Sequence, residues 1–198
     1  VSAQPAEKNT VVGSKRFTES YVLGELINLR LGDAGVQALH RQGLGNTAIV
    51  IQALKTGQID VYPEYTGTIL REILRRPETQ ASLSELNSWL KPIGLKAAIP
   101  LGFNNTYALA MRSEQAKVLG LKRISDIANL TTEKRSTLRI ALSPEFKTRA
   151  DGWPALIQTY DLKIKPGKVL EHGLAYDALV RGDVDIVDAY STDAAILK

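Results

Sequence analysis

The sequence predicts an α/β protein made of two similar lobes, each built around a mostly parallel sheet. Its 198 residues, 44% hydrophobic and 23% charged, suffice for one large domain or two small lobes with their own cores. β-branched runs alternate with segments of helical apolar spacing, which is typical of βαβ units. Residues 178–192 also repeat the pattern of residues 53–67: Ala-Leu, a glycine, an aliphatic-Asp-aliphatic strand and a tyrosine. Such a unit can recur by chance in an α/β protein, but two related lobes explain it better.

The first half is expected to alternate strands and helices. Apolar residues recur at helical spacing between residues 20 and 31, and Asn46 and Gly57 are typical helix-start and helix-stop residues. The expected elements are a strand ending at 11–12, a helix at 20–31, a strand at 36–40, a glycine loop at 43–45, a helix from 46 to 57, a strand at 59–62, a helix at 84–90 and a strand at 96–99.

The second half is expected to follow the same plan. Its expected elements are a strand at 138–142, a helix at 153–160, a strand at 168–171, a helix at 176–181 and a strand at 184–187. Between the halves, Asn104 and Asn105 precede an extended run, and paired asparagines tolerate the unusual backbone angles of a hinge. We therefore expect the first lobe at 1–103 and the second at 104–198, with a ligand cleft between them.

The composition excludes several classes of site. With no cysteine, the chain has no disulfide, thiol nucleophile or zinc–thiolate site. The formal net charge of +4 is spread over both halves, so no basic face marks a nucleic-acid binder. No apolar run is long enough to cross a bilayer, and the polar first ten residues resemble a leader that has been processed or trimmed. Enzyme motifs and metal-ligand clusters are also missing, and His40 and His172 stand alone as structural residues. We expect no cofactor, no metal and no catalysis.

One glycine motif permits another interpretation. Residues 43–48 fit G-x-G-x-x-A between a strand and a helix, and Glu64 lies downstream, as in a dinucleotide-binding enzyme. The loop follows the second strand of its lobe instead of the first. A tight turn before a helix is therefore the favoured interpretation, and a nucleotide-dependent enzyme is the alternative.

Three tyrosines indicate a binding site. Tyr65 and Tyr190 lie just past the carboxyl ends of corresponding strands, where ligands bind in open α/β sheets, and Tyr107 lies near the crossing between lobes. Tyrosine faces suit a quaternary ammonium group, because a permanent cation without N–H donors is held only by cation–π and dispersion contacts. The alternative is that these rings only cap sheet edges.

Two cations and a hydroxyl suit the other end of such a ligand. Lys15 and Arg149 each follow the first strand of a lobe, and Thr68 lies three residues past Tyr65. A carboxylate would fit the planar fork of Arg149 and the point charge of Lys15. Solvated surface cations are the alternative.

The chain resembles the glycine betaine/choline substrate-binding proteins of ABC importers. The resemblance runs through VGSKRFTESYVLGE (12–25), ALKTGQIDVYPEYTGT (53–68), NNTYALAM (104–111), EFKTRADGWP (145–154) and GDVDIVDAYSTD (182–193). It implies a type II periplasmic-binding-protein-like fold, in which each lobe is a βαβ-based mixed sheet with flanking helices. It implies an aromatic cage of Tyr65, Tyr107 and Tyr190 with Asn105 nearby, and a carboxylate site of Lys15, Thr68 and Arg149.

The resemblance also sets expectations about function and partners. It implies a non-enzymatic periplasmic protein that captures a quaternary ammonium osmoprotectant, such as glycine betaine, and delivers it to a membrane permease. A choline-specific binder and a ligand-sensing domain of a receptor or regulator are the alternatives. Family members extend beyond the segment matching 190–193, so we expect a first lobe that lacks part of its sheet, and with it a dimer or a domain exchange.

Overall fold

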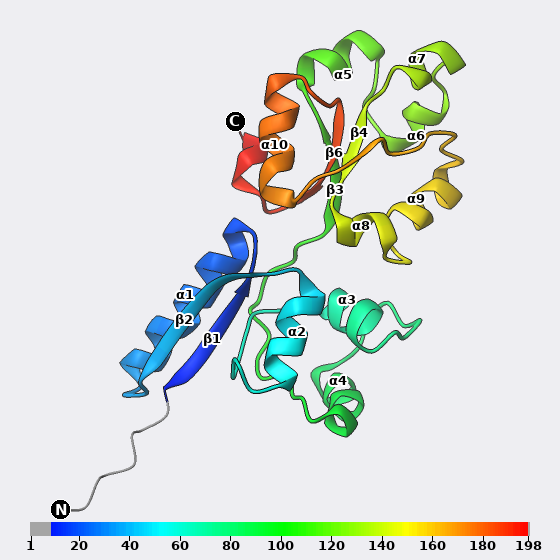
Figure 1. Ribbon diagram of the computed structural model, residues 1–198. Helices are drawn as coiled ribbons and strands as arrows, with labels where there is room; N and C mark the ends of the chain where they lie inside the picture. Colours follow the sequence, from blue (N-terminus) through cyan, green and yellow to red (C-terminus); the bar gives the residue numbers. More distant parts are fainter. Residues whose placement is uncertain (1–8, 198) are drawn as a thin grey trace, which may run out of the picture. The chain divides into compact units, whose positions relative to one another are not determined.

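A computed structural model describes residues 9–197 of the chain. The chain forms two compact units and passes from the first to the second between Pro100 and Leu101 (Figure 1). Each unit has its own sheet, its own helices and its own core, and each is described separately below.

Unit 1 is a two-stranded parallel sheet covered by helices. Strands β1 and β2 are joined by the long helix α1, and α2 follows β2 directly (Figure 1). Val50 and Ala53 of α2 pack with Ile59 in the core. The elements are β1 (Thr10–Lys15), α1 (Thr18–Asp33), β2 (Ala38–Gly45), α2 (Thr47–Lys55), α3 (Thr66–Thr68), the π-helical turn η1 (Ile69–Ile73), α4 (Leu83–Leu90) and the 3-10 turn η2 (Lys91–Ile93).

The glycine segment 43–45 is part of a strand, so the predicted loop is wrong. Strand β2 continues through Gly45, which pairs with Lys15 after a register shift that leaves the extra residues in β2. Gly43 and Gly45 have φ angles of 70° and 149°, which favour glycine. These glycines thus form a β-bulge at the place where a nucleotide-binding turn would lie. The next helix, α2, begins as predicted after Asn46, whose side chain accepts a hydrogen bond from Ile49 N at 3.3 Å.

Two predicted strands of unit 1 are not formed. Residues 59–62 contact β1 through one isolated bridge, Val12 to Val61, because the Asp60 carboxylate accepts the Val11 N–H in place of a backbone carbonyl. Residues 96–99 are not a strand either. The side-chain amide of Asn87 bonds both the N–H and the carbonyl of Ala97, at 2.7 and 3.0 Å.

Unit 2 is a four-stranded mixed sheet with strand order β3-β6-β4-β5. Strand β6 runs parallel to β4 and antiparallel to β3. Helices lie along the sheet, with α10 beside β6 and α8 and α9 after β4 (Figure 1). The elements are β3 (Tyr107–Met111), α5 (Ser113–Leu119), α6 (Ile124–Ala128), α7 (Thr132–Ser136), β4 (Ile140–Leu142), α8 (Pro144–Thr148), α9 (Trp153–Tyr160), β5 (Lys168–Val169), α10 (His172–Arg181), β6 (Ile186–Tyr190) and η3 (Ala194–Leu197).

The hinge expected at Asn104 and Asn105 stays a prediction. Neither residue has a positive φ, and Gly102 takes that conformation instead, with φ of 81°. Glycine adopts a positive φ without the Cβ clash that another residue would suffer.

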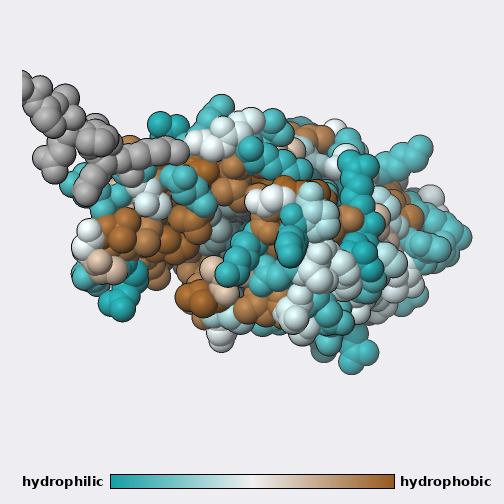
Figure 2. Space-filling model, turned by 90° about the horizontal axis from the view of Figure 1, so that it is seen from below, coloured by the Kyte–Doolittle hydropathy of each residue, from teal (hydrophilic) through white to brown (hydrophobic). Residues whose placement is uncertain are grey.

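Several apolar side chains remain exposed on the described part of the protein. On α1, Val22, Leu26 and Leu29 are each more than half exposed, and brown apolar patches are visible on one face in Figure 2. Within residues 9–197, no helix has the length and apolar character needed to span a membrane.

Candidate functional site

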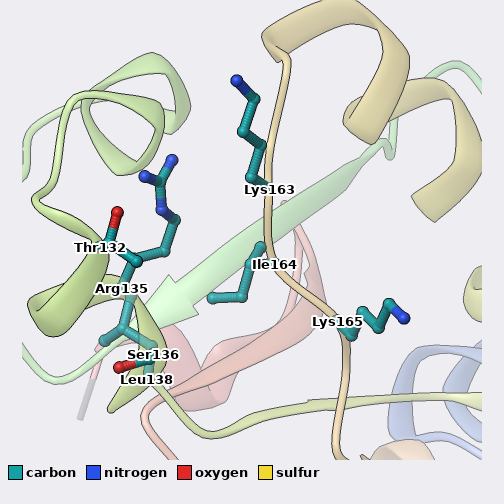
Figure 3. A pocket seen from close by; sticks show the side chains of 7 residues that line it. All are labelled: Thr132, Arg135, Ser136, Leu138, Lys163, Ile164 and Lys165. Atoms are coloured by element: carbon teal, nitrogen blue, oxygen red, sulfur yellow. The ribbon is translucent and has the colours of Figure 1, made fainter.

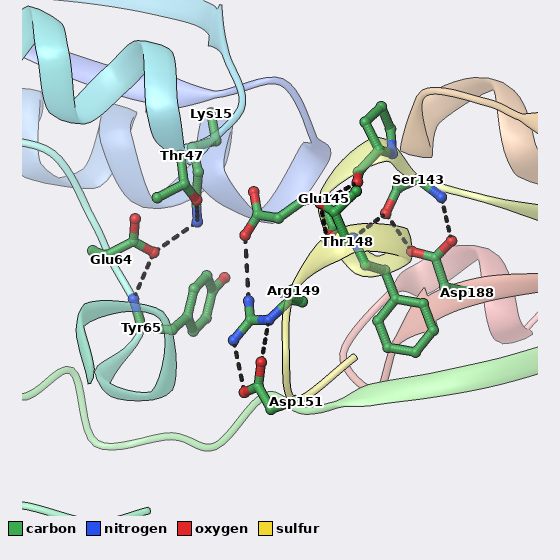
Figure 4. Close-up of polar contacts among 12 residues, drawn as sticks. Lys15, Thr47, Glu64, Tyr65, Ser143, Glu145, Thr148, Arg149, Asp151 and Asp188 are labelled. Atoms are coloured by element: carbon green, nitrogen blue, oxygen red, sulfur yellow. Dashed lines mark hydrogen bonds and ion pairs between the residues drawn. The ribbon is translucent and has the colours of Figure 1, made fainter. Parts of the chain in front are cut away.

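The predicted site residues of unit 1 gather around a buried lysine. Lys15 ends β1 and is 6% exposed, and its Nζ lies 2.6 Å from Glu64 Oε1 and 3.3 Å from Thr47 Oγ1 (Figure 4). Glu64 Oε1 also accepts the Tyr65 N–H at 2.9 Å. We call Lys15, Glu64, Thr47, Tyr65 and Glu19 the Lys15 cluster.

The ring of Tyr65 lies within the Lys15 cluster. Its hydroxyl donates to the Glu19 carboxylate, and the Lys15 Nζ is 5.3 Å from its ring centroid, within cation–π range. Tyr65 precedes the short helix α3, whose last residue is the buried Thr68. The structure thus brings Lys15 and Tyr65 together, and it places Thr68 one helical turn further on.

The predicted site residues of unit 2 lie at one edge of its sheet. Tyr190 is the last residue of β6, and Tyr107, the first residue of β3, is its cross-strand partner. The two ring centroids are 5.2 Å apart. Burial raises the pKa of both phenols well above the usual value.

Arg149 lies against this tyrosine pair. Its guanidinium carbon is 5.1 Å from the Tyr107 ring centroid, and the residue is 5% exposed. The guanidinium donates to both oxygens of Asp151, at 2.7 and 3.0 Å, and to Glu145 Oε1 at 3.3 Å (Figure 4). Burial alone would lower the pKa of Arg149, but its neighbours, first among them the hydrogen-bonded Asp151, together raise it above the usual value. We call Arg149, Asp151, Glu145, Tyr107 and Tyr190 the Arg149 cluster.

A buried carboxylate fixes the helix that carries Arg149. Asp188, in β6, accepts the N–H and the hydroxyl of Ser143 at 2.6 and 2.7 Å (Figure 4). Ser143 in turn caps α8 by accepting from Phe146 N at 3.3 Å. Arg149 directly follows the last residue of α8, so these hydrogen bonds fix the position of its backbone.

His172 is a candidate site residue that the sequence interpretation missed. It was assigned a purely structural role, yet its ring stacks on Tyr190 with centroids 4.1 Å apart. Its Nε2 lies 2.7 Å from Asp193 Oδ2, which also accepts the Tyr190 N–H. Its position could have indicated this role, because His172 comes three residues after β5, at the same edge of the sheet as Tyr190 at the end of β6.

Asn105 lies beside the same edge. Its side-chain oxygen accepts from Ser191 Oγ at 3.4 Å, and Ser191 follows Tyr190 directly. Ser191 Oγ also accepts the Thr106 N–H at 3.0 Å. These contacts tie the approach to β3 to the end of β6, next to the tyrosine pair.

A cavity of about 300 Å³ in unit 2 is not this site. It is lined by residues that precede β4 and β5, at the opposite edge of the sheet from Tyr190, and Figure 3 shows Lys165 extending away from Arg135. Its lining residues are Thr132, Arg135, Ser136, Leu138, Lys163, Ile164 and Lys165. None of them is a predicted site residue. Within residues 9–197, no group of three or more His, Asp or Glu side chains is placed to hold a metal ion.

Comparison with known proteins identifies the family. Residues 8–198 match the family described as the substrate binding domain of ABC-type glycine betaine transport system. The chain is 33% identical over 195 residues to the glycine-betaine-binding protein of Pseudomonas aeruginosa, covering 93% of this chain and 62% of that protein. It is 30% identical over 193 residues to the ergothioneine transport permease/ergothioneine binding protein EgtU of Helicobacter pylori, covering 96% of this chain and 34% of that one.

A solved structure gives the same result. The crystal structure of a glycine betaine/carnitine/choline ABC transporter protein matches with a TM-score of 0.64 and 25% identity, covering 96% of this chain and 71% of that one. The resemblance to the periplasmic-binding-protein-like fold is therefore confirmed. The chain spans about 62% of the length of the Pseudomonas relative. This chain belongs to the family of substrate-binding domains of ABC-type glycine betaine transport systems.

Proposed function

We propose that the chain is the solute-binding component of an ABC importer and that it captures a small quaternary ammonium compound. Membership of the substrate-binding family supports the transport role. Such a component works outside the cytoplasm, passes its ligand to a membrane permease and catalyses no reaction. The Helicobacter relative, whose name joins a permease and a binding protein, supports the permease as partner. A dimer or domain exchange stays a prediction.

The proposed ammonium contacts are the ring faces of Tyr65, Tyr107 and Tyr190. One observation carries this assignment: in each unit, a cation already lies within cation–π range of one of these rings. Lys15 Nζ is 5.3 Å from the Tyr65 centroid, and the Arg149 guanidinium carbon is 5.1 Å from that of Tyr107. A desolvated cation–π contact contributes about 2 kcal/mol, so these ring environments can stabilise a ligand cation.

The proposed contacts of the ligand's polar end are Lys15, Thr68, Arg149 and, nearby, Asn105. Lys15, Thr68 and Arg149 are at least 94% buried, and a buried polar group is costly unless it is hydrogen-bonded. A polar end that exchanges hydrogen bonds with them therefore adds both affinity and orientation. Substitutions in the Lys15 cluster and in the Arg149 cluster should therefore each weaken binding.

Calorimetric titration with choline and glycine betaine tests the proposal. Leucine removes the ring face but keeps an apolar side chain, whereas phenylalanine keeps the face and loses only the hydroxyl. We expect Tyr190→Leu and Tyr65→Leu each to weaken binding of the better ligand by about 10- to 30-fold, which is the loss of one cation–π contact. Tyr190→Phe should bind within a few-fold of wild type.

The matched control is Tyr160→Leu, which removes an exposed tyrosine at the end of α9. It should bind like wild type. Equal affinity of Tyr190→Leu, Tyr65→Leu and the control would contradict the cage, and binding of neither compound by the wild-type chain would contradict the assigned ligand class.

A further inference from the structure

We propose that the cavity of unit 2 between α7 and residues 163–165 binds a phosphate group, free or as a phosphomonoester of a small molecule or a lipid. The cavity lies at the opposite edge of the sheet from Tyr190. This second site is therefore separate from the proposed ammonium site and does not depend on it.

Two segments that are distant in the sequence form the walls of this cavity. One is α7 with the residues up to Leu138, and the other is the segment 163–165 that leads into β5. The sheet holds both in place, because β4 and β5 pair in parallel directly after them and Gly167 N donates to Ile140 O at 2.9 Å. The fold of unit 2 therefore sets the width of the cavity.

Among the described residues, three cations and no carboxylate line the cavity. The cations are Arg135, Lys163 and Lys165. In Figure 3, the side chains of Arg135 and Lys163 extend in the same direction from the two walls, whereas Lys165 extends away from Arg135. Arg135 and Lys163 are therefore the two cations that an anion in the cavity would contact.

The charge of these cations is poorly compensated in the part of the chain that the structure describes. There, Arg135 makes one side-chain hydrogen bond, from Nη1 to the uncharged carbonyl of Ala128 at 3.2 Å, and Lys165 makes none. Lys163 Nζ lies 3.5 Å from Asp161 Oδ2, and the two side chains are 70% and 83% exposed. Water screens such an exposed pair strongly. A bound anion would therefore relieve the repulsion among the three cations.

The sequence around both walls carries the same sign of charge. Residues 131–139 and 161–168 hold six Lys or Arg and two Asp or Glu. Their net charge of +4 equals that of the whole 198-residue chain, so the rest of the protein is neutral on balance. The count over each half of the chain conceals this concentration, because acidic residues elsewhere in unit 2 offset it. Such a local excess of positive charge attracts anions.

The side chains that line the cavity suit a phosphate group. Arg135 offers a planar fork and Lys163 a point charge, and together they match the several oxygens and the double charge of a phosphate. The hydroxyl of Thr132 lies on the same wall as Arg135 and adds a donor. Leu138 and Ile164 supply apolar surface and are 7% and 8% exposed. Apolar surroundings strengthen the attraction between charges.

The same cavity does not suit a nucleic acid. Its volume of about 300 Å³ lies at the lower end of the range for small-molecule sites. No aromatic side chain of the described residues lines it, so it offers no ring on which a base could stack. Recognition then rests on the phosphate group itself, which a small phosphomonoester and phosphatidic acid share.

NMR titrations of the isotope-labelled 198-residue chain test the site. The probes are inorganic phosphate, glycerol phosphate, acetate, and vesicles of phosphatidylcholine with and without phosphatidic acid. We expect phosphate and glycerol phosphate to move the amide signals of residues 131–136 and 163–165. Acetate at the same ionic strength should move them far less, because it carries a single charge.

The probes also distinguish the two sources of the phosphate group. A response to glycerol phosphate assigns the site to a small molecule, and a response only to vesicles that contain phosphatidic acid assigns it to a lipid headgroup. No response to any phosphate probe, an equal response to acetate, or a response confined to other residues overturns the proposal.

Charge-removing variants test the two cations. Lys163→Gln and Arg135→Gln should each weaken binding of the phosphate probe by about 10-fold, which is the loss of one charge-assisted hydrogen bond. Arg135→Lys keeps the charge and should lose less. Lys163→Gln is a safe substitution for the fold, because its side chain is 70% exposed and pairs only with Asp161 among the described residues.

The matched control is Lys117→Gln in α5. Lys117 is an exposed lysine of unit 2 that does not line the cavity, and its substitution changes the net charge by the same amount. It should bind phosphate like wild type. Equal weakening in Lys117→Gln and Lys163→Gln, or none in Lys163→Gln, overturns the assignment. No step of this test uses choline, so it stands or fails independently of the proposed function.

Discussion

The substitution Gly152→Ala tests whether tight packing behind Arg149 supports the Arg149 cluster. Gly152 precedes α9, and a Cβ built on it would lie 2.3 Å from the Phe146 carbonyl oxygen and 2.8 Å from Arg149 Cγ. Favourable separations between nonbonded heavy atoms are about 3.5–4.0 Å, so α8 and α9 must separate by on the order of 1 Å. Overpacking usually costs about 1–3 kcal/mol, and a clash with backbone belongs at the upper end.

Thermal unfolding followed by circular dichroism measures this cost. A loss of about 3 kcal/mol corresponds to roughly 6–12 °C in Tm for a chain of this length. Because the clash also displaces the stem of Arg149, we expect weaker binding of the better ligand. The control is Gly167→Ala, in the same unit, where an added Cβ meets nothing within 4 Å. Equal Tm values for the two variants would refute the packing argument.

Two further predictions concern stability. Asn46→Ala removes the cap that accepts from Ile49 N, so urea denaturation should show a loss of about 1 kcal/mol; an unchanged midpoint contradicts this. Burial alone would raise the pKa of Asp185, but hydrogen bonds from Arg139 and Gln115 hold it well below its ordinary value. The unfolded chain then binds the proton more readily, so the wild type should lose stability as pH falls below about 4. Asp185→Asn should lower the free energy of unfolding by about 3 kcal/mol at pH 7 and lessen this acid sensitivity. Plots of unfolding free energy against pH that run parallel for wild type and variant would contradict this prediction.

Local signals in the sequence were sufficient to place most helices. The Asn46 cap starts α2, and the helix predicted at residues 153–160 matches α9, with Pro154 in its first turn. Gly182 ends α10 in the left-handed conformation. Such signals act through backbone groups within a few residues, so the sequence displays them directly.

Strands depended on partners that the sequence does not reveal. Residues 96–99 have strand-like composition, but Asn87 takes the backbone groups of Ala97, so no ladder forms. Similarly, the Asp60 side chain replaces part of a ladder beside β1. A strand pairs with distant residues, and a side chain that competes for those groups becomes visible only once the chain is folded.

The sequence predicted the tyrosines and cations of the candidate site, but it did not predict the carboxylates that pair with those cations. Tyr107 and Tyr190 were assigned from their positions, but their cross-strand pairing comes from the antiparallel register of β3 and β6. Asp151 and Glu64 were not expected to neutralise the two cations. Asp151 lies two residues from Arg149 and Glu64 lies far from Lys15 along the chain, and in both cases the contact depends on side-chain direction, which the sequence pattern does not fix.

A crystal structure of the chain with bound choline tests the central claim most directly. We expect the trimethylammonium group within about 6 Å of the ring centroids of Tyr107 and Tyr190, the range of cation–π contacts. Choline bound on a surface that includes none of these rings would contradict the assignment of this site.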